Sequence, residues 1–261
     1  VRALEAGADT LLMPADPDVA IRAVVAAVEN GRITRTRIRE SVVRILAAKE
    51  RTGLDRKRFV DLEGIGDVVD SPEDNARAQE IADRAVTLVR NEGGVVPLNP
   101  AASVSFLVLT ESRGSQQGKV LAAEVRKRMP NASITMLDPT AAESDLEQAA
   151  ASTQTSAVTV VAAFVSVAAY RGSVALAGGY PALLNRVLAN GKPVILVALG
   201  SPYLLRNFPI AGGYLTTYST VAPSEIAAVK ALFGEISIQG RLPVTIPGLA
   251  KYGDGIQLGG R

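Results

Sequence analysis

The feature that most constrains the fold is residues 8–53, which predict one strand and two helices with no second strand nearby. The apolar run 10–13 predicts a buried strand, which ends at Pro14 because proline cannot donate a hydrogen bond to a ladder. A strand needs neighbours to satisfy its backbone groups, and one strand with two helices has no sheet to join. We therefore expect residues 8–53 to be the end of something larger.

Two amphipathic helices follow the predicted strand. Asp16 is expected to cap the first helix, which opens with Pro17 in its first turn. The apolar face of this first helix consists of residues at helical spacing: Ile21, Val24, Val25 and Val28. The second helix has an apolar face of the same kind, made of Ile38, Val42, Ile45 and Leu46. Residues 1–7 already form a helical pattern with no capping residue before it, so we expect further sequence upstream of Val1.

Charge and composition restrict the possible functions. A net charge of +2 is too small to indicate binding to nucleic acid or to a membrane surface. No apolar run approaches the ~20 residues needed to span a bilayer. The chain has no cysteine and no histidine, which makes a zinc or copper site a poor candidate and removes the commonest general base. We expect no metal, no cofactor, no nucleic-acid partner and no membrane span.

The rest of the chain predicts a linker and one α/β domain. Residues 54–72 are interpreted as a linker because 54–70 show no sustained period, and Ser71, near the end of the linker, is expected to cap a helix. Strand-like segments at 104–109, 133–137, 157–165, 193–199, 214–218 and 242–246 alternate with helical segments at 117–129, 142–151, 181–189 and 223–233. Apolar strands that alternate with helices predict a mostly parallel sheet covered on both faces. Residues 73–261 should form a three-layer α/β/α sandwich.

Several ordered motifs resemble glycoside hydrolase family 3. Residues 6–14, 27–33 and 38–49 are similar to the last strand and closing helices of that family's (β/α)8 barrel. Residues 85–91 with 96–98 resemble the beginning of its second domain, 240–247 resemble its end, and 192–203 are closest to the two-domain β-N-acetylhexosaminidase branch. The resemblance implies that residues 1–53 are the terminal strand-helix unit of a truncated TIM-type barrel.

The resemblance also implies a retaining glycosidase whose catalytic groups lie elsewhere. Its substrate would carry a terminal β-linked N-acetylglucosamine, with a β-glucosidase of the same family as the alternative. In the family the nucleophile is an aspartate before the last barrel strand, and this branch uses an Asp-His pair as the acid/base, whereas this chain has no histidine. We expect the chain alone to be inactive and a second chain, or a missing N-terminal segment, to supply the rest of the barrel. Secreted, periplasmic and cytoplasmic bacterial locations are all compatible with the family.

Four residues are candidate site residues. Met13 and Asp16 lie at the carboxyl end of the predicted barrel strand, on the side where barrels of this type bind substrate, and a helix cap is the simpler explanation of Asp16. Arg171, next to Tyr170, follows the predicted strand 157–165 and is either a substrate contact or a solvated loop arginine. Glu111 is the one position in the second domain that could act as an acid/base, and its neighbours suit an exposed turn equally well.

Two other functional classes compete with a glycosidase. A nucleotide-binding α/β domain has the right topology, but no phosphate-binding glycine motif occurs: Gly64 and Gly66 follow no predicted strand. A non-catalytic binding or scaffolding module remains open, since the second domain need not do chemistry even in an intact enzyme.

Overall fold

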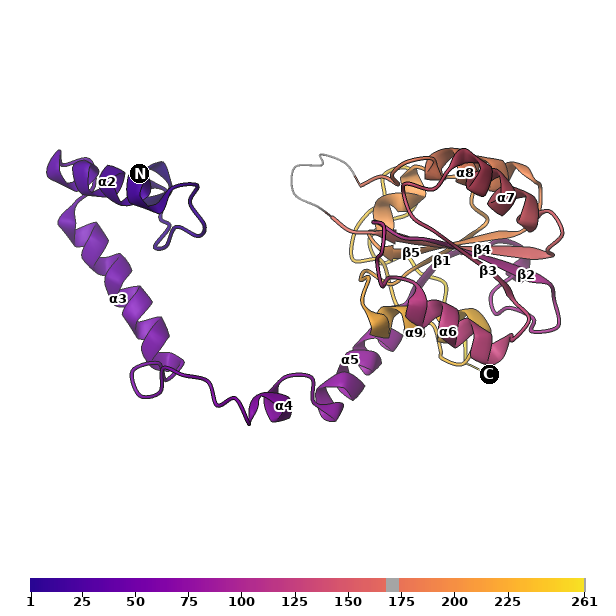
Figure 1. Ribbon diagram of the computed structural model, residues 1–261, viewed down its shortest axis with the longest axis horizontal. Helices are drawn as coiled ribbons and strands as arrows, with labels where there is room; N and C mark the ends of the chain where they lie inside the picture. Colours follow the sequence, from indigo (N-terminus) through magenta and orange to yellow (C-terminus); the bar gives the residue numbers. More distant parts are fainter. Residues whose placement is uncertain (168–173, 261) are drawn as a thin grey trace. The chain divides into compact units, whose positions relative to one another are not determined.

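The computed structural model describes residues 1–167 and 174–260. The chain divides into two compact units, Val1–Asp70 and Ser71–Arg261, which we call unit 1 and unit 2 (Figure 1). Each unit has its own hydrophobic core, so each is described by itself.

Unit 1 is helical. It contains α1 (Arg2–Glu5), α2 (Pro17–Glu29), α3 (Arg35–Arg51) and α4 (Ile65–Val68). A small core of Leu4, Ala27 and Ile33 joins α1, α2 and the turn before α3. Asp9 connects the segment before α2 to α3, because its Oδ1 accepts a hydrogen bond from Ser41 Oγ at 2.8 Å and from Arg37 Nη1 at 2.9 Å. These donors lower the pKa of Asp9.

The prediction of a buried strand at residues 10–13 is wrong for this chain. No strand forms there, and the side chains of Leu12 and Met13 are 87% and 88% exposed. The physical reason is that the segment has no partner strand. A strand forms only against a neighbour, and all six strands of the described residues belong to the sheet of unit 2.

Unit 2 is the predicted α/β sandwich. Its helices are α5 (Pro72–Ala85), α6 (Lys119–Arg128), α7 (Glu143–Thr153), α8 (Tyr180–Ala189) and α9 (Ala222–Phe233), with short 3₁₀ helices η1 (Glu92–Gly94) and η2 (Pro202–Arg206). Its strands are β1 (Thr87–Asn91), β2 (Val104–Leu109), β3 (Ser133–Leu137), β4 (Val158–Val165), β5 (Val194–Gly200) and β6 (Gly213–Thr216). The sheet has the order β1-β6-β5-β4-β2-β3, and only β1 is antiparallel to its neighbour. The mostly parallel α/β fold is confirmed.

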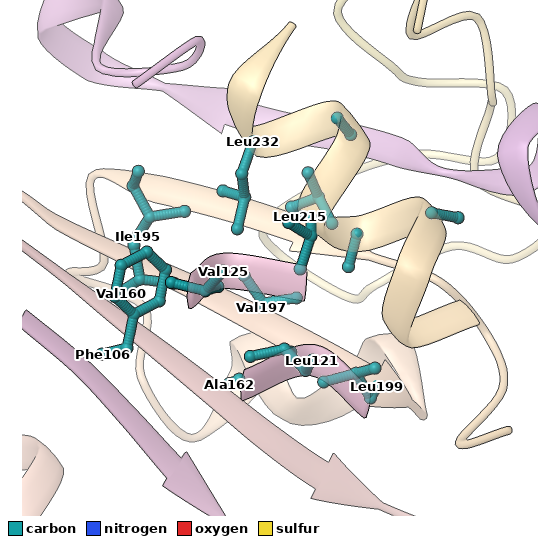
Figure 2. Close-up of a cluster of buried hydrophobic side chains, with 14 of the residues drawn as sticks. Phe106, Leu121, Val125, Val160, Ala162, Ile195, Val197, Leu199, Leu215 and Leu232 are labelled. Atoms are coloured by element: carbon teal, nitrogen blue, oxygen red, sulfur yellow. The ribbon is translucent and has the colours of Figure 1, made fainter. Parts of the chain in front are cut away.

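Helices cover both faces of this sheet (Figure 1). On one face, α5, α6 and α9 contribute to a core in which Phe106, Val160 and Ile195 form one row across three neighbouring strands (Figure 2). On the other face, α7 and α8 pack against the alternate residues of the same strands. Because both faces are covered, the central strands are almost entirely apolar, with Ser105 in β2 and Thr159 in β4 as buried exceptions.

The sheet differs from the sequence prediction in one strand that was missed and one that does not form. Strand β1 was missed, since its charged Arg90 and short length hide the pattern. The predicted strand at residues 242–246 is wrong: Ile246 forms only an isolated bridge with Ala250. Residues 242–246 form hydrogen bonds with the loop that follows them instead of with the sheet. For example, the Leu242 amide donates to the Asp254 carbonyl oxygen at 2.8 Å.

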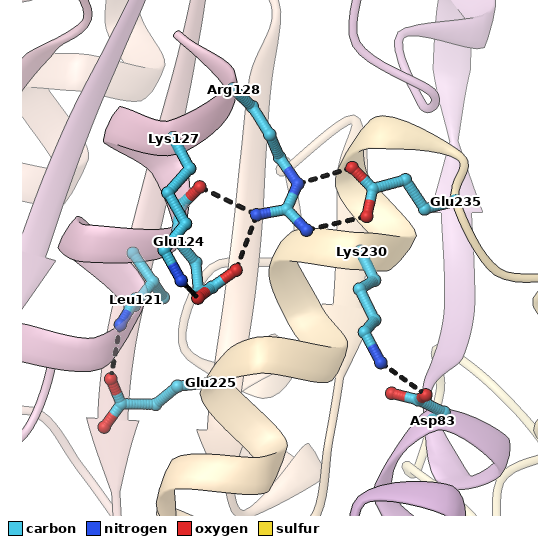
Figure 3. Close-up of polar contacts among 8 residues, drawn as sticks. All are labelled: Asp83, Leu121, Glu124, Lys127, Arg128, Glu225, Lys230 and Glu235. Atoms are coloured by element: carbon cyan, nitrogen blue, oxygen red, sulfur yellow. Dashed lines mark hydrogen bonds and ion pairs between the residues drawn. The ribbon is translucent and has the colours of Figure 1, made fainter. Parts of the chain in front are cut away.

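Arg128 links the ends of α6 and α9. Its guanidinium donates to both carboxylate oxygens of Glu235, at 2.5 and 2.6 Å, and to Glu124 Oε2 at 2.7 Å (Figure 3). The Arg128 side chain is only 18% exposed, so these ion pairs are partly shielded from solvent. The two carboxylates raise the pKa of Arg128 and keep it charged.

We expect Arg128→Ala to lower the free energy of unfolding by about 2 kcal/mol, because two half-shielded carboxylates lose their partner. The neighbouring Arg126→Ala is the control, since Arg126 is exposed and should change stability by less than about 0.5 kcal/mol. Urea denaturation of both variants measures the difference. Equal losses in the two variants would contradict the assignment.

Candidate functional site

The carboxyl ends of the parallel strands bring polar residues to one edge of the sheet in unit 2. Glu111 lies just beyond β2, Ser166 follows β4, Ser201 follows β5 and Thr217 follows β6. Ligands of open α/β sheets bind at this carboxyl edge. We call these residues, together with the turn between β2 and α6, the carboxyl edge.

Glu111 is more than an exposed turn residue. Its Oε1 accepts a hydrogen bond from the Ser166 amide at 2.6 Å, and its Oε2 accepts from Ser166 Oγ at 2.8 Å and from Gln117 Nε2 at 2.9 Å. The side chain therefore joins the end of β2 to the residue after β4. Neither partner was predicted from the sequence: Ser166 meets Glu111 only because β2 and β4 are neighbours, and Gln117 meets it through the fold of the turn that follows β2.

The other predicted site residues lie elsewhere. Arg171 and Tyr170 lie outside the described residues. Met13 and Asp16 belong to unit 1. Met13 has a positive φ of 50°, which is uncommon for a residue other than glycine, and its side chain is exposed.

Asp16 caps α2. Its Oδ1 accepts a hydrogen bond from the Val19 amide at 2.9 Å, and Pro17 occupies the first turn, as expected from the sequence. A helix cap explains the residue type at this position by itself, whatever else the carboxylate contacts.

We expect Asp16→Ala to destabilise α2 by about 1 kcal/mol, because the first turn loses its acceptor. Asp16→Asn keeps an acceptor and is the matched control, with a loss of a few tenths of a kcal/mol at most. Amide hydrogen exchange of the first turn of α2 measures both. Unchanged exchange in Asp16→Ala would show that the cap contributes nothing.

Glu225 is the residue that sequence reasoning missed most completely. It lies on α9, is 3% exposed, and accepts hydrogen bonds from the amides of Gly118 at 3.2 Å and Leu121 at 2.7 Å (Figure 3 shows the latter). Burial raises the pKa of Glu225, and the amides of α6 oppose that rise. A glutamate on the apolar face of a helix that also carries Ala228 and Leu232 was the signal that could have identified it.

The same contact argues against the nucleotide-binding alternative. The N-terminus of α6, which follows β2, is where such a domain would place a phosphate group. Here the carboxylate of Glu225 already accepts from those backbone amides. The anion position is filled by the chain itself.

Within residues 1–167 and 174–260, no group of three or more His, Cys, Asp or Glu side chains is arranged to hold a metal ion. In the same ranges, no helix has both the length and the apolar character to cross a membrane.

Comparison with known sequences identifies a family and a relative. The glycosyl hydrolase family 3 C-terminal domain matches residues 86–256. A protein named β-N-acetylglucosaminidase/β-glucosidase from Cellulomonas fimi is 36% identical over 97 residues, which are 37% of this chain and 17% of that protein.

Solved structures share the fold. A glycoside hydrolase family 3 β-N-acetylglucosaminidase from Paenibacillus sp. matches 94% of this chain and 47% of its own length, with a TM-score of 0.75 and 24% identity. A β-glucosidase from Listeria innocua, in complex with isofagomine, matches 94% of this chain and 37% of its own length, with a TM-score of 0.69 and 18% identity. This chain thus spans less than half of each of these proteins.

Proposed function

This chain belongs to glycosyl hydrolase family 3, and from that premise we propose that it is the C-terminal portion of a retaining β-N-acetylhexosaminidase-like enzyme that removes terminal β-linked N-acetylglucosamine. The observation that carries the proposal is the 36% identity to a relative named β-N-acetylglucosaminidase/β-glucosidase. The motif at residues 192–203, closest to the β-N-acetylhexosaminidase branch, supports the same choice.

We assign no catalytic residue to this chain. A retaining glycosidase needs a carboxylate nucleophile and a second group that first donates and then accepts a proton. The family resemblance puts both groups on barrel segments that precede the last strand, and the histidine of the expected acid/base pair has no counterpart here. The chain by itself is therefore expected to be inactive.

We propose that residues 1–53 are the last strand-helix unit and closing helix of a TIM-type barrel, that 54–72 form a linker, and that 73–261 form the sandwich domain. Unit 1 has large apolar side chains exposed to solvent, which supports this assignment because an isolated helical unit would bury them. They include Leu12, Met13, Val19, Ile21, Val25, Val42, Val43 and Leu46. A second chain, or an N-terminal segment absent from this sequence, would cover them.

Within the complete barrel, Met13 and Asp16 would lie at the carboxyl end of the last strand, where barrels of this type bind substrate. We propose that Met13 contacts the sugar and that Asp16 contributes to the same wall while capping α2. We also propose Arg171, which lies outside the described residues, as a substrate contact.

Substrate preference tests this proposal. We expect a protein that carries this chain and the complete barrel to hydrolyse a chromogenic β-N-acetylglucosaminide faster than the corresponding β-glucoside. The opposite preference would favour a β-glucosidase, and no hydrolysis of either would favour a non-catalytic binding or scaffolding domain.

A further inference from the structure

Two carboxylates, those of Glu111 and Glu225, bind the two ends of the turn between β2 and α6. Glu111 lies at the start of this turn, at the carboxyl edge, and Glu225 reaches its other end from α9. Neither carboxylate has a role in the chemistry proposed above. Their hydrogen bonds instead fix the positions of neighbouring residues.

Glu111 and Gln117 bind each other twice. The Glu111 amide donates to Gln117 Oε1 at 3.0 Å, and Gln117 Nε2 donates back to Glu111 Oε2 at 2.9 Å. The Gln117 amide in turn donates to Ser115 Oγ at 3.1 Å. The Gln117 side chain therefore has both its donor and its acceptor committed to Glu111, and the turn closes on itself.

The next residue fixes this turn to the body of the domain. The amide of Gly118 donates to Glu225, and a Cβ atom on Gly118 would lie 2.3 Å from Val108 Cγ1. The backbone at Gly118 thus packs directly on β2, with no space for a side chain. Because Gln117 precedes Gly118, the partner of Glu111 is held by the rigid start of α6.

Ser166 is the other partner, and it donates twice. Its amide and its hydroxyl bind different oxygens of Glu111, at 2.6 and 2.8 Å. Together with Gln117, the described residues 1–167 and 174–260 thus point at least three donors at this carboxylate. Hydrogen bonds that end on a carboxylate are stronger than those between neutral groups, so Glu111 is well suited to fix the position of Ser166.

We propose that Glu111 is a positioning residue, which acts through Ser166 to set where the chain leaves β4 at the carboxyl edge, and that it is not the proton donor of the hydrolase. The relevance of this edge to sugar binding rests on the proposed function. The contact itself does not, so it is tested on this chain without any substrate.

The test follows two signals by NMR in the 261-residue chain: the Ser166 amide and the side-chain amide of Gln117. In Glu111→Gln, protection of the Ser166 amide against hydrogen exchange should fall about ten- to a hundredfold, the factor expected for loss of a charge-assisted hydrogen bond. The control is Glu147→Gln, the same chemical change at an exposed position of α7, and it should leave Ser166 unchanged. Ser166→Ala should perturb the Gln117 signal less than Glu111→Gln does, because it removes only one of the donors. Unchanged Ser166 protection in Glu111→Gln would overturn the proposal.

Discussion

Gly200→Ala is expected to lower the free energy of unfolding by at least about 3 kcal/mol. Gly200 ends β5 with a φ of 119°, a conformation that side-chain-bearing residues rarely adopt, and a Cβ atom there would lie 2.2 Å from the carbonyl oxygen of Val165. That oxygen also accepts a hydrogen bond from the Ser201 amide at 2.8 Å. Neither strand can yield without breaking a contact at the carboxyl edge.

The matched control is Gly191→Ala. Gly191 also has a positive φ, 69°, but no atom lies within 4 Å of the Cβ position. It should therefore show only the backbone cost of about 1 kcal/mol. Urea denaturation of both variants compares a glycine that has a close neighbour with one that has none, and equal losses would mean that the contact with Val165 is not important.

Glu225→Ala should cost about 3 kcal/mol, because two buried amides at the start of α6 lose their acceptor. Glu225→Gln keeps the shape and one acceptor and should stay within about 1 kcal/mol of the wild-type chain. Chemical denaturation at pH 7 measures both variants. If the alanine variant is as stable as the glutamine variant, the amides have found other acceptors and the contact is dispensable.

The wild-type chain and Glu225→Gln should also differ in how their stability depends on pH. Burial raises the pKa of Glu225 above its ordinary value of 4.5. At pH values between the ordinary pKa and the raised pKa of the folded chain, the folded chain binds more protons at Glu225 than the unfolded chain does. The contribution of Glu225 to the free energy of unfolding therefore falls as pH rises. Glu225→Gln lacks that decline. The wild-type stability relative to Glu225→Gln should therefore decrease as pH rises above about 4.5, and an increase would show that the α6 amides outweigh burial.

The central sheet could be predicted because its strands are buried on both faces. The bounds of β2 follow directly from a mostly apolar, fully buried run. The bounds of the less buried edge strand β3 were also predicted, and the helices differ by only a few residues from their predicted ends. Segments at the margin of the sheet could not be predicted in this way. Whether Thr87–Asn91 or residues 242–246 form a strand depends on which distant backbone groups they meet, and local residue types do not encode that.

The carboxyl edge was only partly predictable for the same reason. Strand ends placed Glu111 there, but its partner Ser166 is 55 residues away and Glu225 is 104 residues from Leu121. In unit 1, by contrast, the cap at Asp16 is a contact between residues three positions apart, and the sequence predicted it.

Hydrolysis of a chromogenic β-N-acetylglucosaminide by the purified 261-residue chain, beside a longer protein that includes the complete barrel, tests most directly whether this polypeptide is one part of a glycosidase. We predict no turnover above background for the chain alone and steady turnover for the longer protein. Turnover by the chain alone that disappears in Glu111→Gln but persists in Glu147→Gln would contradict both the absence of a catalytic residue here and the positioning role of Glu111.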